Sequence, residues 1–147
     1  MPTIDRAIQI AAEAHVGQSD EGGRPKILHV LRVMQACTTD SSRIVALLHD
    51  VVEDNEWTVS LLREEGFDDE VLEALESVTR RDGEPYLLFT RRAARHPIGS
   101  HVRRADLVDK LDLARLGPPI TDEVLLRLQL DYEALRVIDS EHDEQSN

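Results

Sequence analysis

The sequence has one cysteine, few aromatic residues and no long apolar run. Cys37 has no partner in the chain, which excludes an intrachain disulfide and makes a reducing cytoplasm the expected location. Aromatic residues make up only 3% of the 147 residues, so Leu, Val, Ile and Ala must build the core. The longest apolar run, residues 44–48, is far shorter than the roughly 20 residues that span a bilayer. We expect no signal peptide, because the first residues do not form a basic segment followed by an apolar one.

Glycine and proline are also scarce. Seven Gly and six Pro are too few for a linker-rich, collagenous or low-complexity chain. A chain of this length fits one domain that can fold without disulfides. We expect that domain over residues 1–140, followed by an acidic polar tail over 141–147.

Basic residues are outnumbered, with 17 Lys and Arg against 29 Asp and Glu, and the net charge is −12. This balance argues against general nucleic-acid binding and against docking on an anionic membrane. Residues 80–104 are the exception, because they hold seven arginines and only two acidic residues. Such a strip can attract a small anion such as phosphate, although an ordinary solvated helix surface explains the charges equally simply.

Apolar residues recur at spacings of three and four along the whole chain, which predicts an all-α fold of about seven to eight helices. Thr3 and Thr58 are candidate N-caps, and residues 117–119 (Gly-Pro-Pro) are expected to break the chain before the last helix. We expect the polar tail to fray from about Asp139. The expected helices cover approximately residues 4–14, 27–37, 41–54, 58–65, 68–79, 84–95, 100–113 and 121–139.

One expected helix, residues 41–54, carries its polar groups on a single side. At 100° per residue, His49, Asp50, Glu53 and Asp54 share the face opposite the apolar core face. This is either a normal solvated face or part of a site that other helices complete.

Two further residues favour a site. His29 lies on the preceding expected helix and Asp106 on a later one. Two imidazoles and two carboxylates from three helices suit a divalent transition metal such as Mn, Fe or Zn. The adjacent acids Glu53 and Asp54 could orient or deprotonate a water molecule beside such an ion.

The order of several segments carries a family resemblance. These segments are residues 14–18, 23–29, 46–54, 78–79 and 102–107, together with Glu84 and Tyr86. A lone His-Asp pair would be a weak signal, since a second one occurs at residues 142–143. The ordered series, over about residues 4–116, resembles the hydrolase domain of the RelA/SpoT family, within the HD phosphohydrolase superfamily. With room for one domain, it resembles a small stand-alone hydrolase of that kind.

The resemblance implies an all-helical HD domain with a metal, usually Mn²⁺, on His29, His49, Asp50 and Asp106. It assigns Glu53 and Asp54 to water activation. The family's reaction removes pyrophosphate from the 3′ position of guanosine tetraphosphate or pentaphosphate, so the expected partner is a small nucleotide. Candidate substrate-binding residues are Arg24, Lys26, Tyr86, Arg91, Arg92, Arg95, Arg103 and Lys110.

The sequence departs from the family at positions expected to touch the nucleotide. Asp20 and Glu21 stand where the family usually has an Arg-Lys pair, so both charges are reversed. Lys26 replaces a tyrosine, Val30 a proline and Lys110 an asparagine. Three functions therefore remain open: a hydrolase of guanosine tetraphosphate, a hydrolase of another phosphorylated nucleotide or cofactor, and a non-catalytic nucleotide-binding module.

Overall fold

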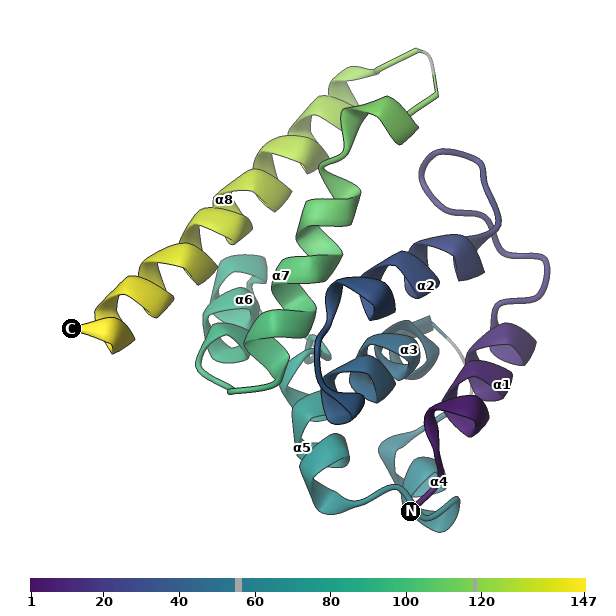
Figure 1. Ribbon diagram of the computed structural model, residues 1–147. Coiled ribbons are helices and arrows are strands. Elements are labelled where there is room, and N and C mark those ends of the chain that lie inside the picture. Colours follow the sequence, from purple (N-terminus) through teal and green to yellow (C-terminus); the bar gives the residue numbers. More distant parts are fainter. Residues whose placement is uncertain (55–56, 118) are drawn as a thin grey trace.

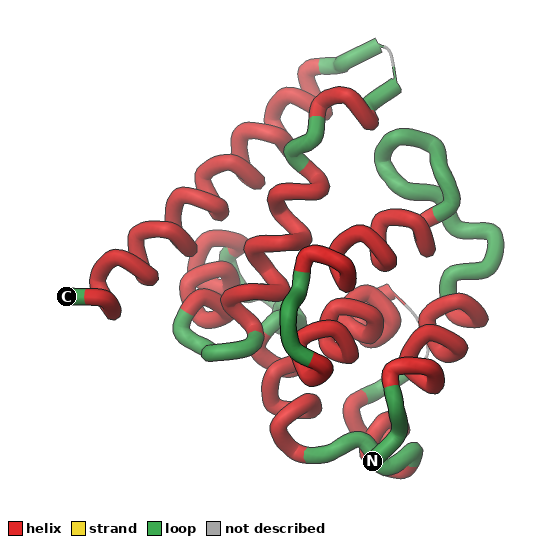
Figure 2. The backbone as a smooth tube through the Cα atoms, viewed as in Figure 1, coloured by secondary structure: helices red, strands yellow, loops and turns green. Residues whose placement is uncertain are grey.

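The computed structural model describes residues 1–54, 57–117 and 119–147, and this part of the chain forms eight α-helices and no β-strand (Figures 1 and 2). The expected all-α bundle is confirmed. Pro118, in the expected break before the last helix, lies outside the described residues. In chain order the helices are α1 (Ile4–Ala14), α2 (Lys26–Ala36), α3 (Asp40–Asp54), α4 (Val59–Glu64), α5 (Asp69–Ser77), α6 (Tyr86–Ala94), α7 (Gly99–Lys110), the short 3-10 helix η1 (Leu113–Arg115) and α8 (Asp122–Ser146).

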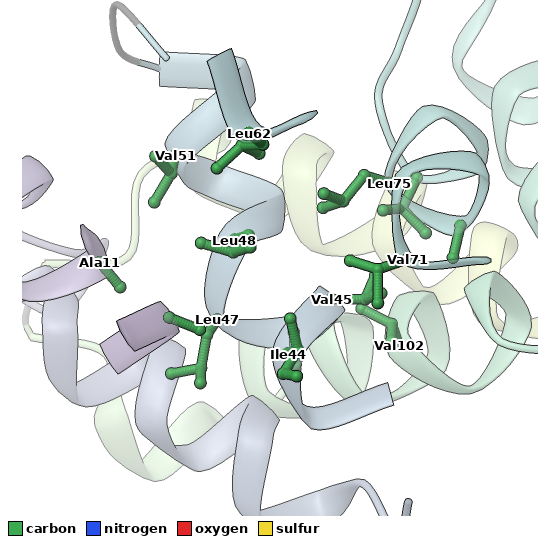
Figure 3. Packing of buried hydrophobic residues seen from close by; sticks show 14 of the residues in the cluster. Ala11, Ile44, Val45, Leu47, Leu48, Val51, Leu62, Val71, Leu75 and Val102 are labelled. Atoms are coloured by element: carbon green, nitrogen blue, oxygen red, sulfur yellow. The ribbon is translucent and has the colours of Figure 1, made fainter. Parts of the chain in front are cut away.

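Helix α3 lies at the centre of the bundle and packs against α1, α2, α5 and α7. Its apolar residues are almost completely buried, with Leu47, Leu48 and Val51 at 0% exposure. Figure 3 labels these side chains together with Ala11 of α1 and Val71 of α5, and all of them belong to one buried hydrophobic cluster. The predicted core face is therefore the face that packs, and its burial turns the polar residues of the same helix toward α2 and α7.

Side-chain caps fix the starts of three helices. Thr58, Asp68 and Thr121 accept hydrogen bonds from the backbone N–H three residues later, at 3.1, 3.1 and 3.3 Å. Thr3 occupies the N-cap position of α1 in an extended conformation, but its side chain makes no capping hydrogen bond. Thr3 is therefore the N-cap residue by position, as expected, but its side chain does not cap the helix.

The loop between α1 and α2 folds tightly on itself. Asp20 accepts hydrogen bonds from the backbone N–H groups of Gly22 and Arg24, both at 2.9 Å. Gly23 has a φ of 77°, a conformation that glycine adopts without strain. The Lys26 N–H then donates to the Gln18 carbonyl at 2.9 Å, which fixes where α2 begins. This loop therefore holds residues 19–22 beside the polar face of α3.

Helix α8 is longer than the sequence indicates and runs to Ser146 along α6 and α7 (Figure 1). The expected fraying from Asp139 is wrong, because side chains from the neighbouring helices hold this segment. Arg104 of α7 donates to Asp139 at 3.0 Å. Arg91 of α6 and Arg95, the residue that follows α6, lie 3.5 and 3.4 Å from Glu141. Among the described helices, none combines the length and apolar character needed to cross a membrane.

Candidate metal centre

Four buried side chains from three helices meet at one point. His29 comes from α2, His49 and Asp50 from α3, and Asp106 from α7; each is at most 5% exposed. His29 Nε2 lies 3.0 Å from Asp106 Oδ1 and 3.8 Å from Asp50 Oδ2. His49 Nε2 lies 3.3 Å from Asp50 Oδ1 and 3.6 Å from Asp106 Oδ1. The residues predicted as a ligand set are thus brought together, and we call them the His/Asp cluster.

The donor atoms of this cluster fit a divalent metal. Ligand atoms of His29, His49 and Asp50 all lie within 4.8 Å of one another, and Asp106 adds an oxygen beside both imidazoles. His49 Nε2 is buried without a hydrogen-bond partner, a costly state that a coordinated ion would relieve. Mixed imidazole and carboxylate donors suit ions such as Mn²⁺, Fe²⁺ and Zn²⁺.

Hydrogen bonds fix both imidazole rings. His49 Nδ1 lies 2.6 Å from the Ala46 carbonyl and His29 Nδ1 lies 2.6 Å from Asp109 Oδ2. If each Nδ1 carries the proton, it donates and Nε2 is free to bind a metal. Arg32 holds Asp109 in turn, with donor distances of 2.7 and 3.1 Å.

Asp109 and Arg32 are site residues that sequence reasoning missed. Each follows a predicted ligand by three residues on the same helix, Asp109 after Asp106 and Arg32 after His29. Residues at that spacing share a helix face, so the positions carried a usable signal.

Two cations stabilise the charge of Asp106. Arg103 and Lys110 donate to Asp106 Oδ2 at 2.8 and 3.2 Å, leaving Oδ1 to face the imidazoles. Burial opposes ionisation, but Lys110 and the hydrogen bond with His29 hold the pKa of Asp106 well below its ordinary value. This carboxylate is therefore ionised and available as a ligand at neutral pH.

Glu53 and Asp54 follow the cluster on the last turn of α3, in different surroundings. Burial, followed by the charge of Asp50, raises the pKa of Glu53 above its ordinary value. Asp54 pairs with Lys26, whose Nζ also lies 3.9 Å from Asp50 Oδ2. A carboxylate with a raised pKa is the better proton acceptor, so Glu53 is the stronger candidate for a general base.

Two cavities adjoin the cluster. The loop-side cavity, about 380 Å³, is lined by residues 19–22 and by Lys26, His29, Asp50 and Glu53. The α8-side cavity, about 210 Å³, is lined by His49, Tyr86, Arg103, Asp106, Arg127 and Asp131. Glu21, Glu53 and Lys110 line both, so the two spaces meet at the last turns of α3 and α7.

The predicted substrate-binding residues divide into two groups. Lys26 and Lys110 line the loop-side cavity, and Tyr86, Arg103 and Lys110 line the α8-side cavity. Neither set of lining residues includes Arg24, Arg91, Arg92 or Arg95. Arg92 instead donates to Glu84 and to the carbonyls of Glu76 and Thr79.

The two reversed loop charges already have partners within the chain. Asp20 caps its own loop, and its Oδ2 lies 3.8 Å from Arg32. Glu21 Oε1 lies 3.0 Å from Arg127 Nε of α8. Both residues nevertheless line the loop-side cavity.

The chain is similar in sequence to several known proteins. A probable GTP pyrophosphokinase of Mycobacterium leprae is 32% identical over 129 residues, which cover 79% of this chain and 16% of that protein. A guanosine-3′,5′-bis(diphosphate) 3′-pyrophosphohydrolase of Borreliella burgdorferi is 35% identical over 82 residues, covering 53% and 12%. The chain therefore spans a small fraction of the length of these curated relatives. No protein-family model matches it.

A solved structure matches almost the whole chain. It is described as a metazoan ortholog of SpoT that hydrolyses ppGpp and plays a role in starvation responses. The TM-score is 0.74 at 24% identity, and the match covers 98% of this chain and 94% of that one. The two proteins share their fold.

Proposed function

We propose that this chain, which is a RelA/SpoT-type HD hydrolase-like domain, is a metal-dependent phosphohydrolase that releases pyrophosphate from guanosine 3′,5′-bis(diphosphate). The observation that carries the proposal is the buried His/Asp cluster, with Glu53 and Asp54 one turn further along α3 and a cavity of about 380 Å³ beside them. A water-activating carboxylate beside a metal site is what hydrolysis of a phosphate ester requires.

His29, His49, Asp50 and Asp106 would hold the divalent ion, with Mn²⁺ as the proposed metal. A bound divalent ion supplies Lewis-acid polarisation of a phosphoryl oxygen and a water molecule of lowered pKa. Asp109 and Ala46 orient the two imidazoles toward the cluster. These outer contacts set the ligand geometry before substrate arrives.

The remaining charged groups act on different parts of the reaction. Lys26 and Lys110 line the loop-side cavity and can neutralise phosphate oxygens. Glu53 accepts a proton from the attacking water. The water oxygen bonds to the phosphorus next to O3′, the P–O3′ bond breaks, and O3′ leaves as a hydroxyl once it has gained a proton. Pyrophosphate departs with the water oxygen, leaving the 5′-diphosphate nucleotide.

A second substrate is favoured by one observation. Asp20 and Glu21 line the loop-side cavity with negative charge, which disfavours a nucleotide with a second diphosphate at this end. A phosphorylated nucleotide or cofactor with fewer charges there would suit the same reaction. A non-catalytic binding module is the weaker alternative, because it has no use for Glu53. The buried free thiol of Cys37 fits a reducing cytoplasm as the place of action.

The test is pyrophosphate release from guanosine tetraphosphate by the purified protein with Mn²⁺. Asp50→Ala and His49→Ala should lose both retained metal and turnover, whereas Glu53→Gln should keep most of the metal and lose rate. Asp139→Asn, which removes one half-buried carboxylate that pairs with Arg104 away from the cluster, is the matched control. Full metal content in both ligand variants would refute the ligand set. A metal-loaded protein that releases no pyrophosphate would refute this substrate.

A further inference from the structure

The α8-side cavity contains polar groups that nothing in the chain satisfies. In the described part of the chain, seven buried side-chain nitrogen or oxygen atoms have no hydrogen-bond partner. Five of them belong to residues that line this one cavity. His49 Nε2 is accounted for by the metal site. Of the other four, Arg127 Nε is ion-paired with Glu21 Oε1 at 3.0 Å, which leaves Arg103 Nε, Arg103 Nη2 and Asp131 Oδ2 without a partner.

Arg103 is the most unusual of these residues. It is only 6% exposed, and its guanidinium lies over the rings of Phe89 and Tyr86, 4.9 and 5.1 Å from the ring centroids. Nη1 donates to Asp106, which leaves Nε and Nη2 as two unpaired donors of a buried cation. Unpaired donors on a buried charge are costly, so a ligand that accepts from both would be bound strongly.

The cavity is lined by four cationic and four acidic residues, so the preference for an anion comes from the unpaired donors of Arg103 and not from net charge. Arg80, Arg103, Lys110 and Arg127 all line it. Three of the four acids are engaged: Glu21 lies beside Arg127, Asp131 accepts from the Tyr86 hydroxyl at 2.5 Å, and Asp106 belongs to the His/Asp cluster. The fourth is Glu53, the candidate general base. Two of the three unpaired atoms are donors, and both belong to the guanidinium of Arg103, which an oxyanion can accept from.

Asp131 narrows the choice of anion. This residue is 4% exposed, and its unpaired Oδ2 needs a hydrogen-bond donor. A monoprotonated phosphate has both acceptor oxygens for Arg103 and a P–OH group for Asp131. Sulfate has no proton to donate at neutral pH and would leave a carboxylate facing an anion. The mixed set of donors and one acceptor therefore matches phosphate better than sulfate.

We propose that the α8-side cavity binds the terminal phosphate of the leaving diphosphate, through Arg103 as donor and Asp131 as acceptor. This inference rests on the proposed function for what the phosphate is attached to. The cavity adjoins the His/Asp cluster through His49 and Asp106, so a diphosphate whose inner phosphate is at the cluster can place its outer phosphate there. The consequence is a preference for a 3′-diphosphate over a 3′-monophosphate.

The first experiment measures binding by calorimetry with the metal-loaded protein, using inorganic pyrophosphate, phosphate and sulfate as probes. Arg103→Lys keeps a cation near Asp106 but removes the two free guanidinium donors, and it should weaken pyrophosphate binding at least tenfold. Arg104→Lys changes the neighbouring residue, which pairs with Asp139 outside the cavity, and should leave that affinity unchanged. Metal content is measured in each variant, so loss of the metal is detected separately.

A second variant does not depend on Asp106. Asp131→Asn replaces the acceptor with a group that can also donate, and it should reduce the preference for phosphate over sulfate at least tenfold. Unchanged pyrophosphate affinity in Arg103→Lys together with an unchanged phosphate-to-sulfate ratio in Asp131→Asn would overturn the proposal. So would an absence of phosphate and pyrophosphate binding in the metal-loaded wild type.

Measurements of turnover distinguish failure of the cavity assignment from failure of the proposed reaction. The ratio of kcat/KM for a 3′-diphosphate over a 3′-monophosphate nucleotide should fall in Arg103→Lys and stay constant in Arg104→Lys. If pyrophosphate binds with the expected variant effects while no 3′-diphosphate nucleotide is hydrolysed, the cavity assignment stands and the proposed reaction fails. If hydrolysis occurs with the same ratio in Arg103→Lys and wild type, the reaction stands and the cavity assignment fails.

Discussion

Replacing Asp109 with asparagine tests whether the hydrogen-bonded support of His29 tunes the metal site. In the structure Asp109 Oδ2 lies 2.6 Å from His29 Nδ1, and Arg32 holds the same carboxylate at 2.7 and 3.1 Å. Asparagine has the same shape but no charge, and its single acceptor oxygen cannot serve both partners as well. The cluster residues themselves remain, so metal binding should weaken without disappearing.

The expected loss can be given a magnitude. Removing a carboxylate that supports a metal-bound histidine typically lowers metal affinity 10–100-fold, which is about 1.4–2.8 kcal/mol. Calorimetric titration of the metal-free protein with Mn²⁺ measures this directly. Turnover should recover at saturating metal, because Asp109 touches no reacting group. A dissociation constant within twofold of wild type would refute the reasoning.

The control for this variant removes a nearby charge from the same cavity. Asp112 lines the loop-side cavity and accepts from Arg115 at 2.9 Å. Arg115 also lies 3.6 Å from Asp109, but among the described interactions Asp112 itself contacts neither Asp109 nor His29. Asp112→Asn should therefore leave the Mn²⁺ dissociation constant unchanged. An equal loss in both variants would mean that general negative charge, and not the support of His29, governs affinity.

Three further predictions concern stability. Leu48→Ala opens a cavity at a fully buried position and should cost about 2–5 kcal/mol in urea unfolding. Gly99→Ala should cost about 1–3 kcal/mol, because its Cβ would lie 2.1 Å from Ser77 Oγ; adding Ser77→Ala should recover part of that loss. The hydrogen bond from Arg92 lowers the pKa of Glu84 from 4.5 to about 2, so this carboxylate stabilises the fold above pH 4.5 and the benefit fades as the pH falls toward 2. The Tm difference between wild type and Glu84→Gln should shrink over that range, and a difference that grows with acidity would contradict the assignment.

Much of the fold could be predicted from periodicity, because the apolar stripes that define the helices are local features of the sequence. The start of α5 is an example, since Asp68 precedes the helix and caps it with its side chain. The C-terminal end of α8 could not be predicted in this way. This segment is polar and shows no apolar stripe. It is held by ion pairs with arginines from elsewhere in the chain, namely Arg91, Arg95 and Arg104.

The site shows the same division between local and distant information. The family resemblance indicated His29, His49, Asp50 and Asp106, and the structure brings the four together. The sequence could not show that Glu21 meets Arg127, because the pair joins positions more than a hundred residues apart. The same holds for the placement of Tyr86 beside Asp131, which shapes the α8-side cavity. Pairing across helices depends on the packed fold, and no local pattern encodes it.

The residues of the His/Asp cluster come from three helices, α2, α3 and α7. This arrangement links the supply of metal to the lifetime of the protein. The ligands meet only when these three helices are packed, so an ion that binds them binds the folded chain and not the unfolded one. Free metal at 100 times its dissociation constant would then add about 2.7 kcal/mol to the stability of the fold. Because proteases degrade chains that open, the same binding would slow turnover of the polypeptide itself. A cell short of the metal would therefore hold fewer copies of the protein as well as less active ones.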